Sequence, residues 1–264
     1  MQATTNQWLI LAGLALCARI MPGLAGLRVL RNAFAPSWTP MASILRLGLP
    51  IGGIMAVEVG VFLAAGVLIG LLGSAALGAH QLVLNCASIP FMVPLGLGQA
   101  ATVRIAYELG AGRALAARRA GMVALALGIG FMSAAAVVLW TVPVAIIAVY
   151  VDIADPANRE TVEIARRLLV IAALFQVFDG MQVIAAGALR GYKDTMVPML
   201  LAGFGYWGAG FGGGWLLAFP LGYGAVGLWC GLALGLAVVA ILLTLRLHLI
   251  AAPLTQAAEA VALR

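Results

Sequence analysis

One apolar run decides the fold of this chain: LGLPIGGIMAVEVGVFLAAGVLIGLL, residues 47–72, holds a single charged side chain, that of Glu58. A helix needs about 20 apolar residues to cross a hydrocarbon core roughly 30 Å thick, and this run is longer than that. The run does not alternate polar and apolar residues, as a membrane-spanning strand does. It therefore predicts a transmembrane α-helix.

The whole chain has the same apolar character. Of its 264 residues, 64% are hydrophobic and 9% are charged, and the mean hydropathy is +1.10. A soluble domain is about 45–50% apolar and about 25% charged, so a water-soluble globule is excluded. Six apolar runs are long enough to span a bilayer: Leu47–Leu72, His80–Tyr107, Gly121–Val149, Leu168–Leu189, Met196–Phe219 and Gly224–Leu245.

A shorter apolar segment precedes these six. Between Gln7 and Arg19 there are only about 11 uninterrupted apolar residues, roughly half of a span, so we expect the end of a helix and a chain that is a fragment of a longer protein. The fold class predicted is an all-α, polytopic integral membrane bundle of about seven transmembrane helices. Its parts are the end of a preceding helix (1–30), a cytoplasmic connecting loop (31–46), a six-helix lobe (47–250) and a cytoplasmic tail (251–264).

The basic residues predict the orientation. The net charge is +6, but the arginines are spread between apolar runs and form no patch for nucleic acid. If the loop that carries Arg46 is cytoplasmic, about twelve of the 15 basic residues fall on that side, as the positive-inside rule requires. We therefore expect the C-terminus in the cytoplasm and the protein in the plasma (inner) membrane.

Two acidic residues lie near the middle of predicted spans, Glu58 and Asp179. An ionised carboxylate at that depth costs at least ~2.5–3.5 kcal/mol on insertion scales, so such residues face a bundle interior or a watered cavity and mark ion or proton paths. We interpret both as cation-coupling residues for H⁺ or Na⁺; the alternative is a protonated acid that is hydrogen-bonded to a neighbouring helix. No other metal and no cofactor is expected.

Other polar residues accompany these acids. Gln176 and Gln182 flank Asp179 at three-residue spacing, which gives one polar stripe on a helix. Gly180 and Gly187 in the same span allow another helix or a ligand to approach closely.

The span 80–107 carries Gln81 and Asn85, followed by Pro90 and Pro94. Prolines bend a helix, and in a membrane the freed carbonyls must find protein or water. A bent wall of a cavity is one interpretation, and hydrogen bonds that merely join helices are the other.

Two further observations bear on function. The chain has no Walker A sequence and too little polar material for a soluble catalytic domain, so we do not expect an enzyme. Several aromatic residues concentrate toward the ends of spans and are interpreted as interfacial anchors: Trp140, Tyr150, Tyr206, Trp207, Trp215, Tyr223 and Trp229.

Three stretches resemble the C-terminal half of a MATE (multidrug and toxic compound extrusion) family efflux transporter. They are LRLGLPIGGIMAVEVGVF (45–62), LGAHQLVLNCASIPFMVPLGLGQAATVRIAYELGAGR (77–113) and FQVFDGMQVIAAGALRGYKDTMVPML (175–200). The resemblance implies two helical lobes that rock against each other, and a secondary antiporter that exports cationic or amphipathic organic compounds in exchange for H⁺ or Na⁺.

The resemblance also assigns roles to residues. Glu58 and Asp179 match the family's cation-coupling acids, and Gln81, Asn85 and Gln182 match positions that line the second-lobe cavity. The first lobe has no counterpart in this sequence, so we expect the missing N-terminal lobe or a complementary chain as a partner, beside a small organic substrate and the lipid bilayer.

Two alternatives remain open. A lipid-linked oligosaccharide flippase of the same superfamily would favour an arginine-rich cavity, whereas the only candidate for an arginine within a span is Arg19 in the short first segment. A seven-helix membrane receptor or scaffold fits the helix count, but the intramembrane acids argue against it.

Overall fold

The computed structural model describes residues 38–262 and, before them, residues 8, 12, 13, 16 and 20. The chain divides into two compact units, Met1–Gly48 and Leu49–Arg264. In the first unit the isolated described residues are helical and exposed. The rest of the expected partial span at 1–30 lies outside the described residues.

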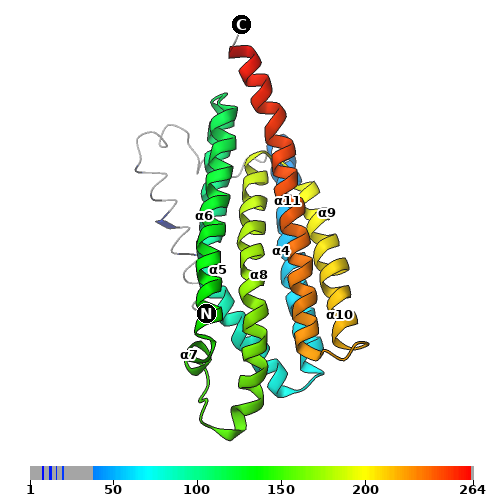
Figure 1. Ribbon diagram of the computed structural model, residues 1–264. Helices are drawn as coiled ribbons and strands as arrows, with labels where there is room; N and C mark the ends of the chain where they lie inside the picture. Colours follow the sequence, from blue (N-terminus) through cyan, green and yellow to red (C-terminus); the bar gives the residue numbers. More distant parts are fainter. Residues whose placement is uncertain (1–7, 9–11, 14–15, 17–19, 21–37, 263–264) are drawn as a thin grey trace. The chain divides into compact units, whose positions relative to one another are not determined.

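The second unit is built from helices throughout the part that the structure describes (Figure 1). Successive membrane-crossing segments run antiparallel: in Figure 1 α6 descends, α8 ascends, the segment from α9 to α10 descends and α11 ascends. The elements are α4 (Trp38–Gly70, which begins in the first unit), α5 (Ser74–Gly110), α6 (Ala114–Thr141), α7 (Pro143–Ala148), η1 (Pro156–Asn158), α8 (Arg159–Gly191), α9 (Met196–Gly203), η2 (Phe204–Gly212), α10 (Gly213–Ala218) and α11 (Gly224–Ala262).

Five described helices are long and apolar enough to cross a membrane, namely α4, α5, α6, α8 and α11. The all-α membrane fold predicted from the sequence is thereby confirmed. The sixth predicted span, 196–219, is not one α-helix: α9, the π-helix η2 and α10 follow each other without a break. The sequence of η2, FGYWGAGFG, is rich in glycine, and the small side chains leave room for the wider π turn, a feature found often at functional sites.

The helices extend beyond the predicted apolar runs. Residues 38–46, expected in the connecting loop, are helical and belong to α4, and residues 251–262 of the expected tail continue α11. The residues before the predicted span 168–189 are helical as well, since α8 begins at Arg159. The apolar length fixes only the part in hydrocarbon, whereas intrahelical hydrogen bonds continue into the headgroup region.

Helix α8 occupies the centre of the second unit. It packs against α5, α6 and α11, and Figure 1 shows it between α6 and α11. In its most apolar stretch of 18 residues, 67% of the residues are buried, whereas the corresponding share in α4 is 17%. The helix can be central because its glycines admit neighbours: a Cβ at Gly187 would lie 2.9 Å from the Cα of Gly98 on α5. The close approach expected at Gly180 and Gly187 is thus observed.

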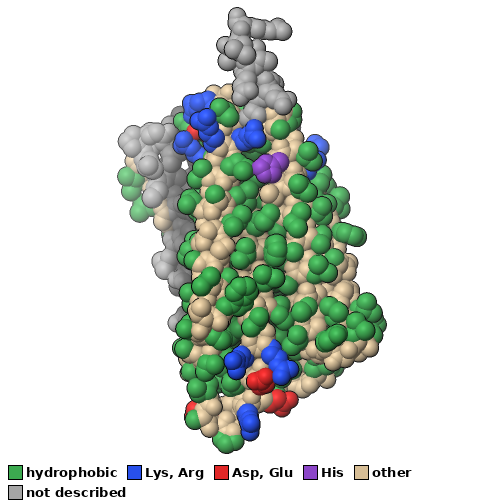
Figure 2. Space-filling model, viewed as in Figure 1, with side chains coloured by type: hydrophobic (Ala, Val, Ile, Leu, Met, Phe, Trp, Pro, Cys, Tyr) green, Lys and Arg blue, Asp and Glu red, His purple; other side chains and the backbone are tan. Residues whose placement is uncertain are grey.

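The face of the unit seen in Figure 2 is apolar along its length and charged at its ends. Lys and Arg side chains gather at the end formed by the α5–α6 turn and the α8–α9 turn, and acidic side chains gather with a few basic ones at the other end. This distribution is typical of an integral membrane protein, whose middle band faces lipid.

Candidate cation site

Glu58 faces a cavity between α4, α5 and α8. The cavity has a volume of about 260 Å³. Its polar lining residues are Glu58 from α4, Gln99 from α5, and Gln182 and Arg190 from α8; the rest of the lining is apolar. The carboxylate is half-buried. It therefore lies inside the bundle and beside a space large enough for ions, water or part of an organic molecule.

Asp179 lies on α8 and is also half-buried. Its carboxylate and that of Glu58 are close enough to interact electrostatically across the gap between α4 and α8. The fold thus brings together the two acids singled out from the sequence. Ionising both carboxylates at this depth costs free energy, because each is poorly solvated and the two negative charges repel each other.

Neither acid is held by a salt bridge among the described residues. The ion pairs there involve Glu108, Glu163 and Asp194. Arg190 interacts with Glu58 through its charge, but its Nε donates a hydrogen bond to the Ala186 carbonyl, 3.3 Å away. Glu58 and Asp179 are therefore free of a fixed basic partner in the part of the chain that is described.

Two glutamines of α8 bracket Asp179, as the sequence pattern predicts, and both are buried. Among the described residues, Gln176 has no hydrogen-bond partner for either amide atom, and Gln182 has none for its Oε1. A buried polar group without a partner is destabilising unless water or a ligand satisfies it. The polar stripe of α8 therefore has unused hydrogen-bonding capacity next to the acids.

Tyr206 is the functional candidate that sequence reasoning missed. It was interpreted as an interfacial anchor, but it is 3% exposed within η2 and lies close enough to Glu58 and Asp179 to feel their charges. Its hydroxyl has no hydrogen-bond partner among the described residues. Glycine-rich sequence on both sides was the available signal, because Gly205 and Gly210 bring η2 against Gly235 of α11 and turn Tyr206 inward.

The other predicted cavity residues lie elsewhere. Gln81 and Asn85 are exposed on α5, and the Asn85 Nδ2 donates to the Gln81 carbonyl at 2.8 Å. Neither lines the cavity at Glu58, where α5 instead contributes Gln99. Pro90 and Pro94 are both inside α5, and the ribbon of this helix runs obliquely at its start and then turns alongside α6 (Figure 1).

Trp229, expected to be an interfacial anchor, is also part of the core. It is fully buried, and its Nε1 donates to Nδ1 of His80 at 3.1 Å. The rings of His80 and Phe175 both contact it edge to face. Nearness to a span's end did not reveal its direction, because an aromatic side chain at that depth can point either outward or into the bundle.

These features define an integral membrane helical bundle with a pair of carboxylates in its interior. The chain belongs to the MatE family, whose model matches residues 50–216. It is 51% identical over 230 residues to a protein named multidrug resistance protein NorM from Burkholderia vietnamiensis, an alignment that covers 87% of this chain and 50% of that one. It is 47% identical over 232 residues to the probable multidrug resistance protein NorM of Pseudomonas aeruginosa, with 88% and 48% covered.

Solved structures show the same fold. The crystal structure of the eukaryotic MATE transporter AtDTX14 superimposes with a TM-score of 0.77 at 22% identity, and the match covers 95% of this chain and 56% of that one. An outward-facing multidrug resistance MATE family transporter of the MOP superfamily matches with a TM-score of 0.63 at 24% identity, covering 76% and 43%. The chain spans about half the length of the curated relatives it matches.

Proposed function

We propose that this chain is the cation-coupled lobe of a secondary antiporter that exports cationic or amphipathic organic compounds in exchange for H⁺ or Na⁺. The observation that carries the proposal is the interacting pair of Glu58 and Asp179, which lie on neighbouring helices inside an apolar bundle and have no salt-bridge partner among the described residues. The relatives' names, which contain the words multidrug resistance, support the export of organic compounds.

The pair of acids suggests how coupling works. With both carboxylates ionised, repulsion and poor solvation favour separation of α4 from α8 or entry of water and cation. A bound Na⁺ or a proton removes that repulsion, so the helices can close. A cation can drive the protein between two conformations only by binding one of them more tightly. The distance between the two carboxylates differs between the conformations, and this gives them different affinities for the cation.

Export also needs a path between two lobes. In transporters built from repeats, substrate binds at the repeat interface, and alternating access comes from rocking of one repeat against the other. We therefore propose a first lobe as partner, on the same polypeptide or on a complementary chain, and a small organic cation as substrate. By the positive-inside rule, the arginine-rich end and the C-terminus lie in the cytoplasm of the plasma (inner) membrane.

One observation favours the flippase alternative. Arg190, which the sequence places at the end of its span, lines the cavity together with Glu58. A guanidinium in a cavity can bind the phosphate of a lipid-linked sugar. The carboxylate on the opposite wall disfavours that anionic group, so we retain the antiporter as the leading proposal.

Transport by a two-lobed protein tests the proposal. This chain would replace the C-terminal half of the Burkholderia vietnamiensis relative, and ethidium efflux would be measured in vesicles with an imposed H⁺ or Na⁺ gradient. Glu58→Gln and Asp179→Asn should each lower gradient-driven efflux at least about tenfold, the effect of losing ~1.4 kcal/mol of coupling. Asp155→Asn in the exposed η1 turn is the matched control. Undiminished, gradient-dependent efflux in both variants would exclude the role of these acids, and binding of a lipid-linked sugar without ethidium binding would favour the flippase.

A further inference from the structure

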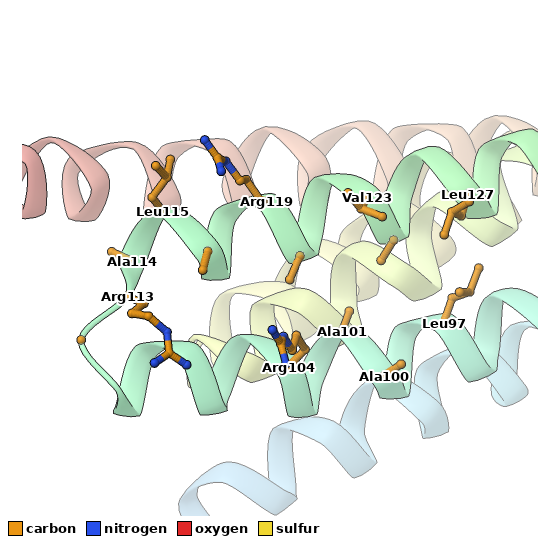
Figure 3. A pocket seen from close by; sticks show the side chains of 14 residues that line it. Leu97, Ala100, Ala101, Arg104, Arg113, Ala114, Leu115, Arg119, Val123 and Leu127 are labelled. Carbon is orange, nitrogen blue, oxygen red and sulfur yellow. The ribbon is translucent and has the colours of Figure 1, made fainter.

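A second hollow lies between α5 and α6, apart from the cavity at Glu58. This groove has a volume of about 790 Å³ and follows α6 from Ala114 to Leu127 (Figure 3). At 1.5 Å per residue that length is roughly 20 Å. One leaflet of a bilayer, headgroups included, is about 20–22 Å thick, so the groove has the length of one lipid molecule.

The walls of the groove suit an acyl chain. Its middle is lined by small side chains, including those of Ala100, Ala101 and Ala120, and its deep end by Leu97 and Leu127. Figure 3 shows the polar side chains at the other end. The groove is therefore apolar along most of its length and has one polar mouth.

The mouth is positively charged. Arg104 and Arg113 both bind the buried Glu108, with Nη2–Oε1 and Nε–Oε2 distances of 2.7 and 2.5 Å. The two arginine side chains remain 65% and 54% exposed, so N–H groups are left for another acceptor. Arg119 also lines the groove and has no ion pair within the described residues. The mouth thus carries three guanidinium groups, and one carboxylate, that of Glu108, neutralises part of their charge.

The start of α6 adds backbone donors at the same mouth. The chain reverses at Gly112, whose φ of 73° is in the region that favours glycine, and α6 begins at Ala114. Its N-cap residue, Arg113, makes no capping hydrogen bond with its side chain, and the first turn has no acidic residue. The N–H groups of the first turn have no partner within the helix, and the positive end of its dipole favours an anion.

We propose that this groove binds an anionic phospholipid of the leaflet at the arginine-rich end. The phosphate lies at the start of α6 between Arg113 and Arg119, and one acyl chain lies along the alanines. Helix α5 connects the groove to the cation site, since Leu97 lines the groove and Gln99, two residues later, lines the cavity at Glu58. A lipid seated against α5 would therefore stabilise one position of a cavity wall. The binding site itself does not depend on the proposed transport function.

The test measures lipid binding to the full chain after delipidation, by native mass spectrometry in detergent. The probes are phosphatidylglycerol and phosphatidylcholine with the same acyl chains. We expect phosphatidylglycerol to bind more tightly and Arg119→Gln to weaken it about fivefold, the effect of one arginine near a membrane surface. Arg118→Gln is the matched control, because Arg118 is the exposed neighbour that does not line the groove. Equal binding of both lipids, or an equal loss in Arg118→Gln, would overturn the proposal.

A second pair of variants tests the acyl-chain part of the site. Ala100→Phe places a large side chain in the groove, whereas Val103→Phe places it at an exposed position of α5 outside the groove. Only the first should lower phosphatidylglycerol binding. Glycerol 3-phosphate at millimolar concentration should not displace the lipid; displacement by it would show a phosphate site without lipid selectivity and would contradict the proposal. Each variant must also keep the wild-type elution volume in size-exclusion chromatography and the wild-type helix content, so that a change in lipid binding does not reflect misfolding.

Discussion

Gly187→Ala should loosen the crossing of α5 and α8, on which the position of the cation site depends. A Cβ at residue 187 would lie 2.8 Å from the carbonyl carbon and 2.9 Å from the Cα of Gly98. Both contacts are with backbone, which no rotamer change can relieve. The carbonyl oxygen of Gly98 would be nearer still, so restoring ordinary contacts of about 3.5 Å requires the helices to separate by roughly 1 Å.

The cost has two parts. Overpacking of a tight interface costs about 1–3 kcal/mol. The same movement lengthens the hydrogen bond from Thr102 Oγ1 to the Gly187 carbonyl, now 2.6 Å, and an interhelical hydrogen bond in a membrane is worth about 0.6–1.7 kcal/mol. Together they give about 2–5 kcal/mol, which lowers the melting temperature by about 4–20 °C at 2–4 °C per kcal/mol.

Thermal unfolding in detergent, followed by circular dichroism, measures this loss. Gly96→Ala is the matched control. Gly96 lies on α5, one of the same two helices, and a Cβ there would meet no atom within 4 Å. The control should unfold at the wild-type temperature or slightly above it, since alanine favours the helix. If Gly187→Ala melts within about 1 °C of Gly96→Ala, the interface is not as tight as this reasoning requires.

Three further variants test other parts of the structure. Asp194→Asn removes the negative charge at the 2.9 Å ion pair with Arg246 and should lower stability by about 1 kcal/mol, a loss that shrinks in high salt because exposed charges are screened; an unchanged denaturation midpoint at low salt would contradict it. Trp229→Phe leaves His80 Nδ1 buried without its donor and should lower stability by about 1–3 kcal/mol; thermal unfolding measures it, and no loss would mean that the bond contributes nothing. Ala154→Cys, in a chain whose native cysteines are replaced, should react with an impermeant maleimide added to intact cells; labelling only after permeabilisation would reverse the proposed orientation.

The sequence predicted the fold and the two acids for one physical reason. Apolar runs of spanning length have few alternatives to helices in lipid, and a carboxylate such as Glu58 within such a run is costly enough to be visible without a structure. The polar stripe at Gln176 and Gln182 followed from helical periodicity alone. These features depend on local sequence alone, so they can be predicted without knowledge of tertiary packing.

What the sequence did not reveal depends on direction and contact. Tyr206 and Trp229 are amphipathic aromatics, which suit an interface and a core equally well, and only packing turned them inward. Arg190 reaches the cavity from a helix end because of the length of its side chain. Neither charge nor hydrophobic periodicity in the sequence distinguishes the π-helix at 204–212 from an ordinary helix. The same is true of the added helical turns at 38–46.

The central claim is that Glu58 and Asp179 together bind and release a cation. Binding of ²²Na⁺ and release of protons on addition of ethidium can both be measured with purified protein at fixed ionic strength. We expect one of the two signals in the wild-type protein, its loss in Glu58→Gln and Asp179→Asn, and its retention in Asp155→Asn. A signal of wild-type size in both intramembrane variants would contradict the claim.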